Sequence, residues 1–189
     1  MSPNALQPGW KIQKAIPLEA EKIATLQSES FYDTYTIFHD GELSPDEQKH
    51  NDDVLKETEG FITPDRIKLR AKLIASSVDG PNVHFYHTAQ LEDGRPVGFI
   101  YGTKEDVKQE IYALYVAKDF KREGVGRALV EKYIEWSDPQ RPVELGVYKE
   151  NERAKRFYTR MGFEALNDDR HSFYDYLPET TMIRKGDQQ

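Results

Sequence analysis

One stretch of the chain, from Ile111 to Trp136, constrains its fold more than any other. It begins with an apolar run, IYALYVA, and continues through a basic loop that contains Gly124 and Gly126. Apolar residues then recur at helical spacing. A strand therefore leads through a glycine-containing loop directly into a helix, and the chain as a whole is best described as one mixed α/β domain.

The start of this helix is a candidate anion site. Backbone N–H groups at a helix start lack internal partners and carry partial positive charge, so they can bind a phosphate or pyrophosphate. Gly124 and Gly126 let the backbone approach the anion closely, and positive charge is added by Lys121, Arg122 and Arg127. The alternative is a strand-to-helix turn with solvated basic side chains. The segment fits neither the G-x-x-x-x-G-K-[ST] loop nor the G-x-G-x-x-G loop.

Composition excludes several classes of protein. The 189 residues are 38% hydrophobic and 31% charged, which allows a sizeable core and argues against global disorder. The net charge of −7 does not favour a broad nucleic-acid surface, since that needs clustered Lys and Arg. The chain has no cysteine, which removes disulfides, thiolate metal sites and a cysteine nucleophile.

The same features predict a cytoplasmic protein without a membrane segment. The longest apolar run, residues 111–117, is far shorter than the roughly 20 residues that span a bilayer. The N-terminus has no basic segment followed by an apolar stretch, so no signal peptide is expected. Residues 1–8 are predicted to be a loose leader, and residues 9–186 a single domain.

Hydrophobic periodicity and turn signals predict alternating strands and helices around the central stretch. Asp93-Gly94 predicts a hairpin between two strands, Thr63-Pro64-Asp65 a helix start and Pro17 the opening of an earlier helix. The polar stretch from Gly41 to Gly60 could be helical. The expected strands are residues 10–16, 83–91, 96–103, 110–117, 143–148 and 163–166, with one or two more in 172–184.

The basic loop resembles a known motif. Lys121-Arg122-Glu123-Gly124-Val125-Gly126 is similar to the pyrophosphate loop Q/R-x-x-G-x-G/A of the GNAT N-acetyltransferases, which binds acetyl-coenzyme A. The first position departs from that pattern, because Lys121 stands where the family has Gln or Arg. The adjacent Arg122 makes the departure tolerable.

A second motif strengthens the resemblance. The segment from Asn151 to Phe163 resembles the family's N-x-x-A-x-x-F-Y-x-x-x-G-F helix and follows the first motif with one strand between them. The resemblance covers residues 96–166 and is thin over residues 1–82. It implies a GNAT-like α/β (α+β) fold, with a mixed, mostly antiparallel twisted sheet flanked by helices.

The resemblance implies transfer of an acetyl group from acetyl-coenzyme A to a primary amine. The absence of cysteine favours direct attack within a ternary complex over a thioester-enzyme intermediate. The cofactor would lie in the cleft between the strands 110–117 and 143–148, and a backbone N–H near Leu114 would polarise the thioester carbonyl. The residues expected at the cofactor are Leu114, Val116, Lys121, Arg122, Glu123, Gly124, Val125, Gly126, Arg127, Asn151 and Phe157.

Two residues are candidates for acid–base catalysis. The resemblance implies that Tyr158 protonates the leaving thiolate and that Glu110, at the start of the central strand, acts as general base through water. Each also has a plainer interpretation, a core tyrosine and a solvated strand-end glutamate. Strict alternation along the strand would place Glu110, Leu114 and Val116 on one face. Asn151 is expected to cap the following helix and to contact the cofactor.

The acceptor is the least determined part. Phe31, Tyr32 and Tyr35 fall in the family's usual acceptor region and could form a cation–π site, although core packing explains them equally well. A small cationic amine such as a polyamine is the first expectation, and a peptide or protein amine is the second. A non-catalytic acyl-coenzyme A-binding module, or a binder of phosphorylated ligands, is the alternative. His84 and His87 should point to opposite faces of a strand, so no metal is expected. The protein is expected to be a monomer or a homodimer.

Overall fold

The computed structural model describes residues 9–79, 82–166, 168, 170, 172 and 174–187, so the predicted leader lies outside the described residues. A seven-stranded sheet forms its centre, in the order β1-β2-β3-β4-β5-β7-β6. The strands are β1 (Trp10–Lys14), β2 (His84–Leu91), β3 (Pro96–Lys104), β4 (Gln109–Val116), β5 (Val143–Tyr148), β6 (Glu164–Ala165) and β7 (Glu179–Arg184). All neighbouring pairs are antiparallel except β4 and β5, which are parallel. The predicted mixed, mostly antiparallel sheet is confirmed.

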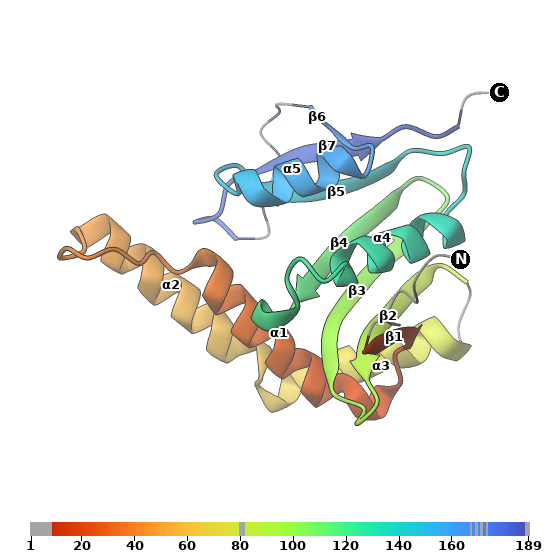
Figure 1. The fold of residues 1–189 in the computed structure, drawn as a ribbon, viewed down its shortest axis with the longest axis horizontal. Helices are drawn as coiled ribbons and strands as arrows, with labels where there is room; N and C mark the ends of the chain where they lie inside the picture. Colours follow the sequence, from red (N-terminus) through yellow and green to blue (C-terminus); the bar gives the residue numbers. More distant parts are fainter. Residues whose placement is uncertain are drawn as a thin grey trace, which may run out of the picture.

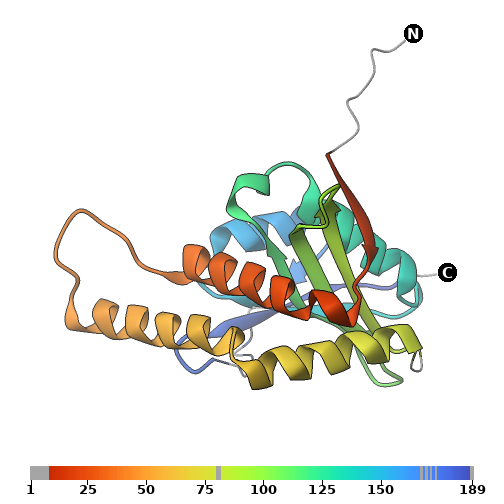
Figure 2. The same cartoon turned by 90° about the horizontal axis from the view of Figure 1, so that it is seen from below.

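Helices cover both faces of the sheet (Figure 1). They are α1 (Ala20–Tyr35), α2 (Pro45–Phe61), α3 (Pro64–Asp79), α4 (Val125–Trp136) and α5 (Glu152–Arg160). Leu129 and Tyr133 of α4 and Tyr158 of α5 pack in one buried cluster, and Ile23 of α1 and Ile74 of α3 pack in another on the opposite face. Figure 2 shows that α1 and α2 lie side by side and extend beyond the sheet.

The N-terminal half differs from the sequence expectation mainly at its boundaries. Pro17 begins a 3₁₀ turn, and the α-helix proper follows it. Phe31, Tyr32 and Tyr35 all belong to the C-terminal end of α1. The polar stretch contains α2, whose start is capped by Ser44 through a hydrogen bond from the Glu47 N–H at 3.3 Å.

Strand β4 contains an irregularity that changes which side its residues face. Tyr101 of β3 pairs with Ala113, whereas Gly102 pairs with Ile111, so Tyr112 is an extra residue, a β-bulge. Ile111, Leu114 and Val116 consequently pack in the cluster beneath α4, although 111 and 114 are three positions apart. The expectation that Glu110 shares a face with Leu114 and Val116 is therefore wrong, because a bulge reverses the alternation.

The parallel pair β4–β5 is short. Only three residue pairs join the strands, the last being Ile111 with Leu145. Beyond this pair the strands diverge, as Figure 1 shows. Both helices of one face, α4 and α5, begin shortly after the diverged ends of these strands. The short pairing leaves the edge of β4 without a strand partner where those helices begin.

Candidate active site

The loop before α4 directs its backbone N–H groups away from the protein's own acceptors. Gly124, with φ of +82°, precedes the first helical residue, and Arg122 has φ of +80°. The first helical hydrogen bond runs from the Ala128 N–H to the Gly124 carbonyl at 3.0 Å. Among the residues that the structure describes, the N–H groups of residues 124–127 have no acceptor. This is the arrangement that binds phosphate at a helix start.

The basic side chains of this loop differ in their surroundings. Lys121 is turned toward α1, where its Nζ lies 3.4 Å from the Thr34 hydroxyl. Burial, together with the nearby charge of Arg153, lowers the pKa of Lys121. Arg122 and the neighbouring Glu123 are exposed. Arg127 is exposed as well, and it donates a 2.7 Å hydrogen bond to Glu131 one turn later.

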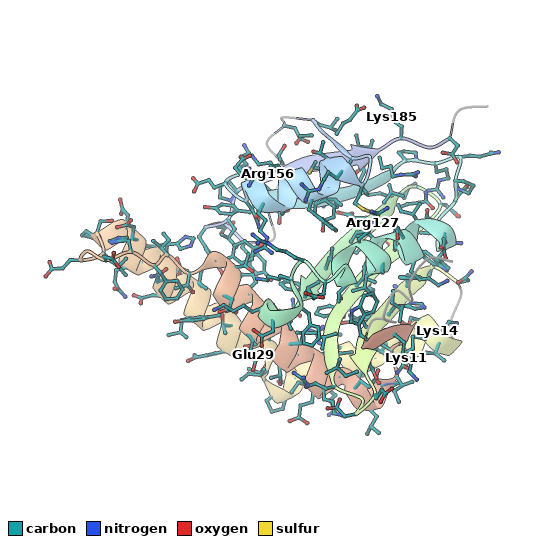
Figure 3. The ribbon with its side chains drawn as sticks, viewed as in Figure 1. Lys11, Lys14, Glu29, Arg127, Arg156 and Lys185 are labelled. Carbon is teal, nitrogen blue, oxygen red and sulfur yellow. The ribbon has the colours of Figure 1, made fainter. Side chains whose placement is uncertain are left out.

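Three elements meet beside the first turn of α4. A Cβ at Gly126 would lie 3.5 Å from Val116 of β4 and 3.6 Å from the Phe157 ring of α5. Val125 is fully buried beneath the loop. The apolar wall formed by Val116 and Phe157 therefore lies directly beside the unpaired N–H groups. Figure 3 labels Arg127 on α4 and Arg156 on α5.

The diverged edge of β4 presents backbone groups of its own. The Ala117 N–H donates to the Val97 carbonyl at 2.9 Å. The backbone N–H and carbonyl groups of the odd-numbered residues in this part of β4 therefore face β3. The backbone groups of Leu114 and Val116 then face the side where β5 has moved away. The Val116 carbonyl accepts a 3.4 Å hydrogen bond from the Ser30 hydroxyl of α1.

Asn151 fulfils the predicted capping role at α5. Its Oδ1 accepts a hydrogen bond from the Ala154 N–H at 2.9 Å. The same side chain hydrogen-bonds the Tyr35 hydroxyl and thereby lowers the pKa of Tyr35. Burial, with the charge of Glu179, outweighs this effect and raises the pKa of Tyr35 to about 12. The cap thus connects α5 to the last turn of α1.

Tyr158 of α5 lies in the buried cluster that α4 also covers, and it interacts with Tyr35 of α1. Its side chain is 8% exposed and packs edge-on against Phe157 and Phe163, with ring centroids 5.0 Å and 5.6 Å apart. Burial raises its pKa well above the ordinary value, and the neighbouring Tyr35 adds to the shift. In the described part of the chain its hydroxyl forms no hydrogen bond. A neutral phenol with a free O–H can donate a proton at neutral pH.

Glu110 is a buried member of an ion-pair network, and its side chain lies on the face of the sheet opposite that of its neighbour Ile111, which packs beneath α4. Its carboxylate pairs with Arg170 and, at 2.8 Å, with Lys108. Lys108 also reaches Glu144 of β5 at 3.1 Å. Glu110 is therefore not the solvated strand-end glutamate that the sequence also allowed, since its side chain is only 4% exposed.

The aromatic residues of α1 have separate environments. Phe31 is fully buried and packs against Phe61 and Tyr35, which is the core role that the sequence left open. Tyr35 is partly buried and also contacts the Tyr148 ring at the end of β5, with centroids 5.9 Å apart. Tyr32 is partly exposed and lines a pocket of about 310 Å³ between α1 and α2, together with Ile37, Phe38, His39, Asn51 and Leu55.

Sequence reasoning did not identify Arg170 and Glu179. Arg170 joins Glu110 to Glu179 across three strands, and its Nε lies 3.4 Å from the Glu179 carboxylate. The available signal was Gly146, because a glycine inside a strand often marks a close approach by another group. A Cβ there would lie 2.9 Å from the Arg170 Nε and would overlap the Glu179 carboxylate.

The described residues contain no group of three or more His, Cys, Asp or Glu side chains able to hold a metal ion. His84 stacks on Tyr101 and His87 on Phe85, rings that belong to clusters on opposite faces, so their predicted divergence is confirmed. No described helix is long and apolar enough to cross a membrane.

Comparison with known proteins agrees with this geometry. Residues 28–163, well over half of the chain, match the model of the Acetyltransferase (GNAT) family. An uncharacterized N-acetyltransferase of Lactobacillus delbrueckii is 26% identical over 93% of this chain and 99% of its own length. Another, of Methanocaldococcus jannaschii, is 40% identical over 38% of this chain and 36% of its own length.

The fold recurs in solved structures. The PaiA N-acetyltransferase of Thermoplasma acidophilum in complex with coenzyme A superimposes with a TM-score of 0.68 and 18% identity. The superposition covers 93% of this chain and 98% of that one. Family match, motifs and fold agree, and the chain belongs to the GNAT family of acetyltransferases, which use acetyl-coenzyme A.

Proposed function

We propose that this protein transfers an acetyl group from acetyl-coenzyme A to a primary amine by direct attack within a ternary complex. One observation carries the proposal. The unpaired N–H groups of residues 124–127 lie beside the diverged edge of β4, and both border the apolar wall of Val116 and Phe157. An anion, an extended chain and a reacting carbonyl can therefore be held in sequence along one path.

The residues along this path fit the cofactor. The N–H groups of Gly124 to Arg127 would hold the pyrophosphate, with Lys121 and Arg122 adding positive charge. The backbone groups of Leu114 and Val116 would pair with the pantetheine amides. Glu123 and Val125 would contribute to the shape of the loop, and Asn151 and Phe157 would border the thioester end.

Acetyl-coenzyme A supplies an activated acyl group, and the protein has two tasks around it. An attacking amine, with a pKa near 10.4 for a lysine-like group, must lose a proton at neutral pH. The leaving sulfur must gain one, and Tyr158 is the proposed donor, because burial keeps its phenol neutral. The backbone N–H near Leu114 would donate to the carbonyl oxygen as charge develops.

The carboxylates near the diverging strands support a cationic acceptor. Among the described residues, two cations, Lys108 and Arg170, hold Glu110, Glu144 and Glu179 together. The rings of Tyr35 and Tyr148 border the same region. We propose a small cationic amine, of which a polyamine is one example, as the acceptor. Glu110, the general base that the resemblance implies, is one of these carboxylates, and Lys108 and Arg170 already hold it in ion pairs.

Calorimetric titration with acetyl-coenzyme A, followed by a thiol-release assay, tests the proposal. The amine panel would be spermidine, agmatine, ethanolamine and a short peptide with a free α-amine. Saturable binding with amine-dependent release of thiol is expected, with spermidine or agmatine faster than the peptide. Equal affinities for coenzyme A, ADP and inorganic phosphate would instead indicate a simple phosphate binder. Binding without thiol release from any amine would contradict the proposed transfer.

A further inference from the structure

Glu179 occupies the point at which β4 and β5 separate. It begins β7 and lies directly opposite Tyr148 of β5. Its carboxylate extends over Gly146, which is the residue after Leu145, the last β5 residue paired with β4. Because Gly146 has no side chain, the carboxylate can rest against the β5 backbone there. Glu179 lies outside residues 28–163, which carry the family match.

The two carboxylates joined by Arg170 are not equivalent. The Glu110 side chain is 4% exposed and has two cationic partners, Lys108 and Arg170, within 3 Å. The Glu179 side chain is 22% exposed, and its contact with Arg170 is longer, at 3.4 Å. Within the described residues the Glu179 carboxylate has no other hydrogen bond or ion pair. An incoming ammonium group can reach Glu179 without displacing a tight ion pair.

The charges around Glu179 suit proton transfer. Burial raises the pKa of Glu179, the Arg170 guanidinium opposes this shift, and the charge of Glu110 adds to it. Among the described residues, Tyr35 of α1 also interacts with Glu179, whereas the hydroxyl of Tyr148 on β5 donates to Glu150 at 3.1 Å. Both tyrosines are neutral phenols at pH 7. A carboxylate with a raised pKa is a better general base near neutral pH than an ordinary one.

We propose that Glu179 is the general base that removes a proton from the acceptor's ammonium group, and that Arg170 and Glu110 act as positioning residues for it. The inference deepens the proposed function and rests on it. Glu179 takes one proton from the ammonium and later releases it to solvent. The nitrogen then forms the C–N bond as the C–S bond breaks. Tyr158 donates a proton to the sulfur and regains one from the nitrogen, so protons balance.

The pH dependence of turnover for Glu179→Gln and Glu110→Gln, beside the wild-type protein, tests this assignment. The probe is the amine that the wild type acetylates fastest in the panel named above. Wild-type kcat/KM should level off above the pKa of Glu179. Glu179→Gln should be about 100-fold slower at pH 7 and should rise about tenfold per pH unit toward pH 9, because only free amine then reacts. Its affinity for acetyl-coenzyme A should be unchanged.

Two comparison variants make the result specific to Glu179. Glu164→Gln removes an exposed carboxylate paired with Lys185 at 3.0 Å on the neighbouring strand, and it should match the wild type. Glu110→Gln should have a lower kcat but should keep the level region of the pH profile. A pH profile of Glu179→Gln that levels off would overturn the assignment. A pH profile of Glu110→Gln that no longer levels off would also overturn it, and this second test remains available if Glu179→Gln does not fold. If the wild type itself releases no thiol, the proposed function fails, and the assignment fails with it.

Discussion

The two edges of strand β4 are built differently. Toward β3 it forms seven residue pairs interrupted by one bulge, and toward β5 it forms three. The long pairing fixes the strand in place, and the short pairing leaves backbone groups and a partly buried carboxylate network at the opposite edge. A strand that is firmly held on one side can present unpaired groups on the other without losing its position.

Two strand glycines offer the largest effect with which to test this difference. A Cβ at Gly102 would meet the buried Tyr133 ring and, at 2.6 Å, the Glu110 carbonyl, neither of which can move freely. The atoms nearest to a Cβ at Gly146 are instead the ends of the Glu179 and Arg170 side chains. Gly102→Ala should therefore lower the free energy of unfolding by about 3 kcal/mol.

Gly146→Ala should lower it by less than about 1 kcal/mol but should reduce kcat about tenfold, because the Glu179 carboxylate is displaced. Urea unfolding of both variants, with thiol release for Gly146→Ala, makes the comparison. Equal destabilisation would mean that the two edges do not differ in rigidity as described.

The next effect concerns Tyr158, on the side of β4 that faces β5, which we call the open edge of β4; the side paired with β3 is its closed edge. Tyr158→Phe should lower kcat about 100-fold and leave the affinity for acetyl-coenzyme A unchanged, because only proton donation is lost. Tyr133→Phe is the matched control at the closed edge. It removes a 2.6 Å hydrogen bond to the Thr103 carbonyl and should cost about 1 kcal/mol of stability without changing kcat. Turnover of Tyr158→Phe at the wild-type rate would exclude Tyr158 as the acid.

His87 of β2, on the part of the sheet away from β5, makes the free energy of unfolding depend on pH. Burial, with the charges of Lys14 and Lys132, lowers its pKa from 6.5 to about 4. Between these values the unfolded chain binds a proton that the native protein does not. Stability is therefore full above pH 6.5 and is lost as the pH falls toward 4, by about 2 kcal/mol.

Urea unfolding at pH 7.5 and 4.5 measures this loss. His87→Phe should keep the ring contact with Phe85 and should show a loss smaller by that amount. The same acid-side loss in both proteins would show that carboxylates, and not His87, cause it.

The smallest effect separates backbone strain from ligand binding. Gly124 and Gly94 both have positive φ, +82° and +78°, and a Cβ at either would meet nothing within 4 Å. Substitution of either glycine by alanine should cost about 1 kcal/mol of stability. Gly124→Ala should also weaken binding of acetyl-coenzyme A several-fold, whereas Gly94→Ala should not. Calorimetry on both variants decides whether the loop conformation matters for the ligand.

Local sequence patterns identified the glycine loop and the helix cap beside β4, but not the carboxylate network at its edge toward β5. The Gly124 loop and the Asn151 cap depend on residues that are close together in the chain, so local patterns predict them. Arg170, Glu110 and Glu179 come together only through strand pairing, and no local spacing relates them. The strands and helices themselves were largely predicted, whereas the bulge at Tyr112 followed from no pattern in the residues around it.

The bulge at Tyr112 has a consequence for the exchange of amide hydrogens with solvent. Amides of β4 that bond to β3 exchange only when the sheet opens, which makes them slow. The Leu114 and Val116 amides and those of residues 124–127 face away from such partners and exchange quickly. A single strand therefore contains two populations of amides that alternate along it, and occupation of the cleft would slow one population while leaving the other as it was.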